Sequence, residues 1–439
     1  MNKKTQAGNP WTAEDERKHP SSTLEWWSVL GFFTSKEDPK HWSLKATLSE
    51  GITDPQHFGS LTNIALLDED AHHQYVFIDR KLNSEMKTRQ DVFEVNLDDS
   101  SMKGKYPLYE VRIRDPKNDI LIEITLHAEA FPHWVAQEAS NGWLPMGLGV
   151  FRYGFIPKLK ITGTMTIQGK RLSIEGTGYF EHVWGNFSFI DPLSQHRNLG
   201  KTLGVYARLL GWWLSQQNPR IPSSLMWSTE NNPLGYDWAW AVLDNGWTMF
   251  YGNILGFFME GLAMGLLILS KDGKTYTEFG DLSFRYTKTT FAQQYDFLYP
   301  TELEITAHHN EETLRLRFTM TSTSREYLSR FSQGKFWLGF VICEAPGIVE
   351  GEYTKGTERI HLKGTCKIEP QRQVSVLGHN SLRINVLKPP RGVGVSIEVD
   401  SHYLGKTITA DLQILQKPRV RFRYSRSKKT DKKTNQTAS

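Results

Sequence analysis

The stretch GTGYFEHVWGNF ends a strand-like segment by presenting a carboxylate, an imidazole and an indole within four positions. Neighbouring side chains on a strand point to opposite faces, so His182 and Trp184 share a face and Glu181 joins them only where the strand bends. A His beside an indole in an apolar pocket has its charged form disfavoured, which lowers its pKa. Glu181 and His182 are therefore candidate catalytic residues, with Tyr179 and Trp184 as candidate ligand contacts. A buried His with a backbone partner, packed on Trp184, is the structural alternative.

Glu25 stands directly before Trp26 and Trp27 at the start of the first expected strand. A carboxylate that enters a core there must be paired, or its pKa is raised and it acts as an acid. Glu25 is therefore another candidate catalytic residue, with both indoles as candidate ligand contacts. An exposed glutamate at a strand start is the alternative.

A third cluster lies in GYDWAWAV, where alternation places Tyr236, Trp238 and Trp240 on one face of a strand. Tyr236 and Trp238 are candidate ligand contacts. Asp237 faces the other side or lies in the preceding turn, the usual place for an Asp at a strand start, and a catalytic carboxylate is the alternative.

Several common chemistries have no motif in this chain. There is no phosphate-binding glycine loop, dinucleotide fingerprint, HExxH, Cys-x-x-Cys or Gly-x-Ser-x-Gly elbow. The adjacent His pairs at 72–73 and 308–309 would diverge on a strand, which argues against metal sites there. We expect neither a cofactor nor a metal ion.

The elements that position these residues are mostly strands. Alternating segments such as KLKITGTMTIQ and KRLSIEGTGYF recur with turn residues about every ten positions, and Asn245-Gly246 between two apolar runs predicts a hairpin. Short, regularly spaced strands favour barrels or sandwiches over parallel α/β layers. At 439 residues, two domains are expected.

One segment, residues 199–216, has helical spacing instead. Its apolar positions recur on one side, at Leu199, Leu203, Tyr206, Leu210 and Trp213. This pattern predicts an amphipathic helix that lies across a barrel mouth or between domains, with an interfacial membrane helix as the alternative. The helix and the polar loop after it mark the expected domain boundary.

The two halves also share a weak repeat. GTMTIQGKRLSIEGT (163–177) and GEYTKGTERIHLKGT (351–365) both place glycines thirteen apart, and this alignment sets Glu181 against Glu369. His182 then meets Pro370 and Trp184 meets Arg372. Since the His and Trp occur in the first copy only, the shared architecture does not require them, which favours a functional role.

The composition of the chain limits its possible binding partners and cellular location. The chain carries a net charge of +4, yet nine of its 52 Lys and Arg lie between Lys417 and Ser439, so the rest is mildly acidic. This basic tail could touch anionic lipid, and we expect no specific nucleic-acid partner. Two cysteines, no secretory signal and no membrane span predict a cytoplasmic protein, peripheral at a membrane if the helix and tail bind one. The sequence leaves the oligomeric state open.

The division expected along the chain has five parts. Residues 1–21 and 425–439 are polar and predict disorder, and 199–232 form the helix and linker. Two β-domains, 22–198 and 233–424, make up the rest.

The sequence resembles the AttH-like family. The resemblance rests on the residues quoted above, and in particular on EWW at 25–27, residues 151–186 and YDWAWAVLDNG at 236–246. That family includes the carotenoid 1,2-hydratases (hydroxyneurosporene synthases) and is related in fold to fungal lipocalin-like Diels–Alderases. The resemblance covers most of 22–380. It implies an all-β fold of two lipocalin-like antiparallel β-barrels in tandem. In this chain, the short amphipathic helical insertion predicted above would lie between them.

The resemblance to the hydratases implies acid catalysis, in which a carboxylic acid protonates an isolated C=C bond and water captures the tertiary cation. His182 and Trp184 match the family's His-x-Trp, and Tyr236 and Asp237 fall near its second cluster. This sequence has Glu181 where the family usually has Asp, Ser28 in place of a Tyr, and a long insertion at 199–230.

Three functional hypotheses follow. The first is a cofactor-free enzyme that hydrates, cyclises or isomerises an apolar isoprenoid-, polyene- or lipid-like molecule inside a β-barrel cavity. The second is a non-catalytic carrier of such a ligand. The third is a structural or interaction protein whose barrels are filled with side chains, which leaves no cavity.

Overall fold

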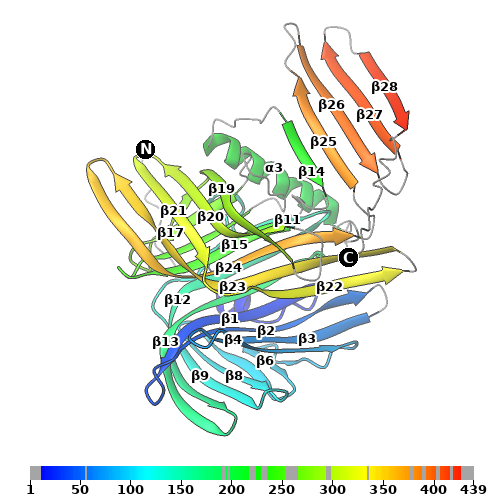
Figure 1. The fold of residues 1–439 in the computed structure, drawn as a ribbon. Helices are drawn as coiled ribbons and strands as arrows, with labels where there is room; N and C mark the ends of the chain where they lie inside the picture. The colour runs from blue at the N-terminus through cyan, green and yellow to red at the C-terminus, as the bar shows by residue number, and fades with distance from the viewer. Residues whose placement is uncertain are drawn as a thin grey trace, which may run out of the picture.

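The computed structural model describes residues 11–426, apart from 55–56, 190–193, 195–197, 217–223, 229–234, 254–264, 293–297, 334–335, 376–379, 388–391, 402–405 and 416–418. Two curled antiparallel sheets dominate the molecule, one below the other in Figure 1. The expected all-β fold of two lipocalin-like halves is confirmed. No helix in these ranges is long and apolar enough to cross a bilayer.

The first sheet has thirteen antiparallel strands and runs in the order β4-β3-β2-β1-β13-β12-β9-β8-β7-β6-β5, with β10 and β11 paired to β12. Their bounds are β1 (Leu24–Ser35), β2 (His41–Asp54), β3 (His57–Asp68), β4 (His73–Lys81), β5 (Lys87–Thr88), β6 (Phe93–Leu97), β7 (Ser100–Lys105), β8 (Leu108–Asp115), β9 (Ile120–Ala128), β10 (His133–Trp134), β11 (Trp143–Met146), β12 (Gly149–Ile167) and β13 (Lys170–Asn186). A short helix, α2 (Gln137–Ser140), lies between β10 and β11.

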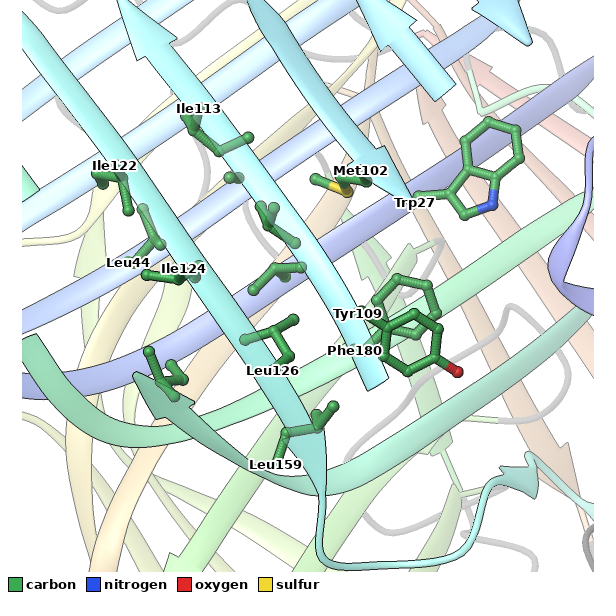
Figure 2. Packing of buried hydrophobic residues seen from close by; sticks show 14 of the residues in the cluster. Trp27, Leu44, Met102, Tyr109, Ile113, Ile122, Ile124, Leu126, Leu159 and Phe180 are labelled. Carbon is green, nitrogen blue, oxygen red and sulfur yellow. The ribbon is translucent and has the colours of Figure 1, made fainter. Parts of the chain in front are cut away.

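The hollow of this first sheet is filled with apolar side chains. Alternation along β8 and β9 turns every second residue inward, and these pack on the inward residues of β1 and β13. Figure 2 shows Trp27, Tyr109 and Phe180 together at one end of the cluster, where the Tyr109 and Phe180 rings stack 4.9 Å apart. The curled sheet therefore encloses a packed core.

The second sheet has ten strands, in the order β18-β17-β16-β15-β24-β23-β21-β20-β19, with β22 paired to β23. Its strands are β15 (Gly235–Leu243), β16 (Thr248–Asn253), β17 (Gly265–Ser270), β18 (Thr277–Phe279), β19 (Asp281–Phe291), β20 (Leu298–His309), β21 (Glu312–Met320), β22 (Arg325–Gln333), β23 (Phe336–Lys355) and β24 (Glu358–Ser375). The predicted hairpin at Asn245-Gly246 joins β15 to β16, with Gly246 at a φ of 86° that suits glycine.

The two sheets pack against each other through aromatic side chains. Phe155 of β12 stacks on Phe250 of β16 at 4.8 Å, and Phe32 of β1 stacks on Trp240 of β15 at 5.5 Å. The Trp240 indole also donates a 2.8 Å hydrogen bond to the Pro157 carbonyl. These contacts hold β1 and β12 of the first sheet against β15 and β16 of the second.

The expected domain 233–424 is split in the structure. Strands after Ser375 do not join the second sheet; β25 (Asn380–Leu387), β26 (Gly392–Ser401), β27 (Lys406–Leu415) and β28 (Arg419–Arg426) form a separate five-stranded sheet with β14 (Ser224–Ser228). Part of the expected linker is thus the edge strand of this sheet. The loop around β14 and most of the basic tail lie outside the described residues.

The predicted helix is present as α3 (Leu199–Gln216), but its buried side differs from the expected one. Thr202, Val205, Leu209 and Trp213 are buried. Leu199, Leu203, Leu210 and Leu214 are exposed, which leaves a leucine stripe on the outer side. The periodicity was consistent with either face, because both carry apolar residues at helical spacing.

The expectation of disorder for 1–21 is wrong for the described part, residues 11–21. This segment contains α1 (Ala13–Glu16), capped by Thr12, and lies against the first sheet. Trp11 is buried, the Asp15 carboxylate accepts a 2.8 Å bond from Arg152, and Glu16 accepts a 2.7 Å bond from the Tyr109 hydroxyl. Specific partners on the sheet thus order a segment whose polar composition suggested a tail.

Candidate functional site

Strand alternation on β1 and β13 divides the predicted site residues between two places. These strands pair antiparallel, with Trp26 opposite Val183 and Ser28 opposite Glu181. Trp26 and Glu181 face the second sheet and line a cavity, and Tyr179 packs on the same side. Glu25, Trp27, His182 and Trp184 face the core of the first sheet. The strand does not bend enough to bring the adjacent Glu181 and His182 together.

The inner group centres on His182, which is fully buried. Its Nδ1 lies 2.7 Å from the Asp15 carbonyl oxygen, and its Nε2 lies 2.9 Å from Oε1 of Glu25. Because a carbonyl oxygen only accepts, Nδ1 carries a proton. The contact between Nε2 and the Glu25 carboxyl couples the two buried groups, so they titrate as a unit.

His19 and two indoles complete the inner group. The His19 backbone N–H donates to Glu25 at 3.0 Å, and the His19 ring stacks on Trp184 with centroids 4.0 Å apart. Trp27 stacks on His182 at 4.7 Å. Burial lowers the pKa of His182; burial raises that of Glu25, but hydrogen bonds from His182 and His19 outweigh it and lower the Glu25 pKa.

Within the described ranges, His19, Glu25 and His182 form a cluster whose side-chain atoms could bind one metal ion. One ligand atom each from His19, Glu25 and His182 lies within 4.8 Å of the others. Hydrogen bonds from both histidine rings to Glu25 already join these atoms. We assign the group a role in fixing the N-terminal segment on the sheet.

The cavity lies between the two sheets and not within one β-barrel as expected, because apolar side chains fill the hollow of the first sheet; its volume is about 230 Å³. Side chains from β1, β2, β12 and β13 form one wall, and side chains from β15, β16, β23 and β24 form the other. The lining is mainly apolar and aromatic and includes Trp26, Leu30, Met146, Trp238, Phe250 and Phe340. Such a space with few polar groups is typical of small-molecule sites.

Glu181 is one of the carboxylates at this cavity. It accepts a 2.8 Å hydrogen bond from the Trp26 indole, a 3.2 Å bond from the Tyr179 hydroxyl and a bond from the Tyr153 hydroxyl. Trp238 in turn donates to the Tyr153 oxygen at 2.9 Å. Burial raises the pKa of Glu181, and the hydrogen bonds from Tyr153 and Trp26 only partly offset this.

Glu369 of β24 is the other glutamate that lines the cavity in the described residues. It accepts a 2.7 Å bond from the Tyr236 hydroxyl and pairs with the ammonium group of Lys45 from β2. Lys45 also lies 3.2 Å from Glu344. Burial lowers the pKa of Lys45, but the charges of Glu344 and Glu369 raise it overall, so the lysine is a fixed cation at this end of the cavity.

The structure corrects the reading of Asp237. Its carboxylate points into the core of the second sheet, where it pairs with Arg372 at 2.7 Å and accepts a bond from Tyr286. It is a buried structural ion pair, so the catalytic alternative for its side chain is not supported. Tyr236 and Trp238, on the opposite face of β15, line the cavity, and Asp237 also borders it.

Three residues at the cavity were missed by the sequence reading. Tyr153 and Lys45 lie in ordinary alternating segments, and nothing in those segments separates them from other strand residues. Glu369 had a signal, because the weak repeat set it against Glu181.

No family model matches the chain, and no curated protein matches it. Among solved structures, it resembles a protein from Nitrosomonas europaea described as an AttH, with 17% sequence identity and a TM-score of 0.55 over 82% of this chain and 96% of that one. It also resembles kievitone hydratase from Nectria haematococca, with 12% identity and a TM-score of 0.53 over 83% of this chain and 94% of that one. The resemblance to AttH-like proteins is thus confirmed for the fold.

Proposed function

We propose that this protein binds an apolar, isoprenoid- or polyene-like small molecule in the cavity between its sheets, and that Glu181 protonates it there. The reaction class is acid-promoted hydration, cyclisation or isomerisation without a cofactor. The observation that carries the proposal is a buried carboxyl group with a raised pKa at the wall of a mainly apolar cavity.

Protonation of a C=C bond needs a strong acid that stays neutral until it is used. Burial of Glu181 favours the neutral acid, as for other carboxylic acids held in apolar sites. The Tyr153 and Tyr179 hydroxyls and the Trp26 indole then stabilise the carboxylate that forms when the proton leaves. Burial thus keeps the Glu181 carboxyl group neutral before the proton transfer, and fixed hydrogen-bond donors stabilise its negative charge afterwards.

The carbocation that follows protonation needs electron-rich surfaces. Trp26 and Trp238 both line the cavity, and indoles are the best of the side-chain π systems for binding a cation. A non-catalytic carrier would need the cavity but not a buried acid in its wall. Hydration is the first reaction to test, because one protein with this fold is a hydratase.

We also propose that the protein is cytoplasmic and collects its ligand at a membrane surface. The exposed leucines of α3 offer an apolar strip, and Lys201 and Arg208 on the same helix are exposed. The basic tail would add attraction to anionic lipid.

The test is native mass spectrometry with lipid extraction on wild type and on Glu181→Gln, purified from the same host. The proposal expects an apolar ligand with both proteins, chemically altered with the wild type and unaltered with the variant. An unaltered ligand with both would leave a carrier, and no ligand with either, even after incubation with farnesol, would contradict a binding function.

A further inference from the structure

The cavity carries two glutamates in corresponding positions of the two sheets. The weak repeat aligns Glu181 with Glu369, and the structure places both repeats in long hairpins, β12–β13 and β23–β24. Both side chains line the same cavity. The internal repeat therefore brings two equivalent carboxyl groups to one space between the sheets.

The correspondence extends to the partner strands. Trp26 of β1 pairs two residues beyond Glu181 on β13, and Tyr236 of β15 pairs two residues beyond Glu369 on β24. Each of these aromatic residues donates a hydrogen bond to its own glutamate, at 2.8 and 2.7 Å respectively. Each carboxyl group thus accepts a hydrogen bond from the neighbouring strand of its own sheet, which is β1 for Glu181 and β15 for Glu369.

The surroundings of the two glutamates differ in charge. The three partners of Glu181 are neutral donors, whereas Glu369 is paired with the ammonium group of Lys45. An adjacent cation favours the ionised carboxylate, and burial beside neutral groups favours the acid. Two carboxyl groups in opposite environments are the usual arrangement for an acid and a base.

We propose that Glu369 is a second catalytic residue of this cavity and acts as the general base that activates water, an inference that rests on the acid role of Glu181. The nearest charged group is Lys45, which contacts it; Lys45 also contacts Glu344, which pairs in turn with Arg325 and Lys367. Tyr236 keeps the carboxylate in position.

The step balances with water as co-reactant. The O–H bond of Glu181 breaks, and its proton forms a C–H bond with one carbon of the C=C bond, whose π electrons make that bond. The water oxygen forms a C–O bond with the neighbouring cationic carbon, and one O–H bond of the water breaks as its proton passes to Glu369. Glu181 is then a carboxylate and Glu369 an acid, and proton exchange with solvent restores both without any redox change.

The test uses farnesol as the probe in deuterium oxide, with mass spectrometry of recovered farnesol and of its hydrate. With Glu369→Gln we expect hydrate formation to fall by about 10²–10⁴-fold, the usual contribution of general base catalysis. Deuterium should still enter recovered farnesol, because Glu181 still protonates the alkene and the cation reverts. Glu181→Gln should abolish both signals.

Two further variants control for charge and folding. Glu344→Gln removes a carboxylate from the same lysine but not from the cavity lining, so a comparable loss there would show that Glu369 acts through Lys45 and overturn the base role. Glu369→Asp keeps the carboxylate and should restore part of the hydration, which a merely structural role would not require. The base role would also be overturned if Glu369→Gln hydrated farnesol at a rate within about threefold of the wild-type rate, because a general base usually contributes far more than that.

Failure of the underlying function looks different. If the wild type neither hydrates farnesol nor exchanges deuterium into it, the acid role of Glu181 fails, and the role of Glu369 falls with it. If exchange occurs without any dependence on Glu369, only the base assignment fails.

Discussion

The side chains of Glu181 and His182 lie on opposite faces of β13. Glu181 lines the cavity between the sheets, and His182 lies in the core of the first sheet on Glu25 and the Asp15 carbonyl. The acid and the imidazole therefore belong to two separate groups, and substitutions at these adjacent positions should have different effects.

Glu181→Gln should remove catalysis and preserve binding. Glutamine keeps the size of the side chain, and its single amide oxygen can still accept from Trp26 while its amide N–H faces the Tyr153 oxygen, but it has no acidic proton to give. We expect turnover of farnesol to fall by about 10²–10⁴-fold, with the dissociation constant from tryptophan quenching little changed. A variant that keeps its turnover would contradict the acid role.

His182→Ala should act on stability. It removes one of the two histidine partners of the buried Glu25 carboxyl and opens a space under Trp27, so we expect a loss of about 3–5 kcal/mol in the free energy of unfolding. Urea unfolding measures this loss. Limited proteolysis should show faster cleavage in residues 11–21, which the group anchors, and unchanged protection of that segment would contradict the anchoring role.

A double-mutant cycle separates this pair from general packing. Glu25→Gln and His182→Gln, alone and together, should show a coupling of about 1–3 kcal/mol in urea unfolding, as expected for contacting groups. Asp115→Asn and His182→Gln form the matched control, because Asp115 is also buried but bonds only Asn118 among the described contacts. Additive effects in the first cycle would mean that the contact between His182 and Glu25 does not stabilise the fold.

The pH dependence follows from the direction of the Glu181 pKa. Because burial raises it in the folded protein, the neutral acid persists above the usual glutamate range, and activity should fall as the pH rises through the raised value. The same group stabilises the fold fully below its unfolded pKa of about 4.3, and this contribution is lost as the pH rises through the folded value. Comparing pH profiles of activity and unfolding with those of Glu181→Gln checks both; superimposable unfolding profiles would mean that the Glu181 pKa is not raised.

The leucine stripe of α3 should govern membrane contact. Leu203→Ser with Leu210→Ser removes the two central exposed apolar residues and should reduce flotation with anionic phospholipid vesicles. Ala207→Ser, exposed on the same helix, is the control and should float like the wild type. Equal flotation of all three proteins would exclude the helix as the contact.

Much of the fold was predictable because it follows from local alternation and turn chemistry. The hairpin at Asn245-Gly246 and the helix at 199–216 are both local signals, and both are present. The face that α3 buries was not predictable, since it depends on contacts such as the bond from Thr202 to the Leu148 carbonyl. Residues 11–21 were misread for the same reason, because their partners lie far along the chain.

For the site, the sequence supplied the residues but not their grouping. Strand alternation places Glu181 and His182 on opposite faces, whereas the resemblance to the hydratases predicts that they belong to one site. Tyr153 and Lys45 reach the cavity only because the two sheets pack face to face. No single-strand pattern encodes that packing, so long-range contacts decide which strand residues meet the ligand.

The most direct test of the central claim is hydration of farnesol in water labelled with oxygen-18, measured for the wild type and for Glu181→Gln under the same conditions. If Glu181 is the acid, the wild type should form a labelled tertiary alcohol and the variant none, while both proteins bind farnesol. Equal labelling by the two proteins, or binding without any product from the wild type, would contradict it.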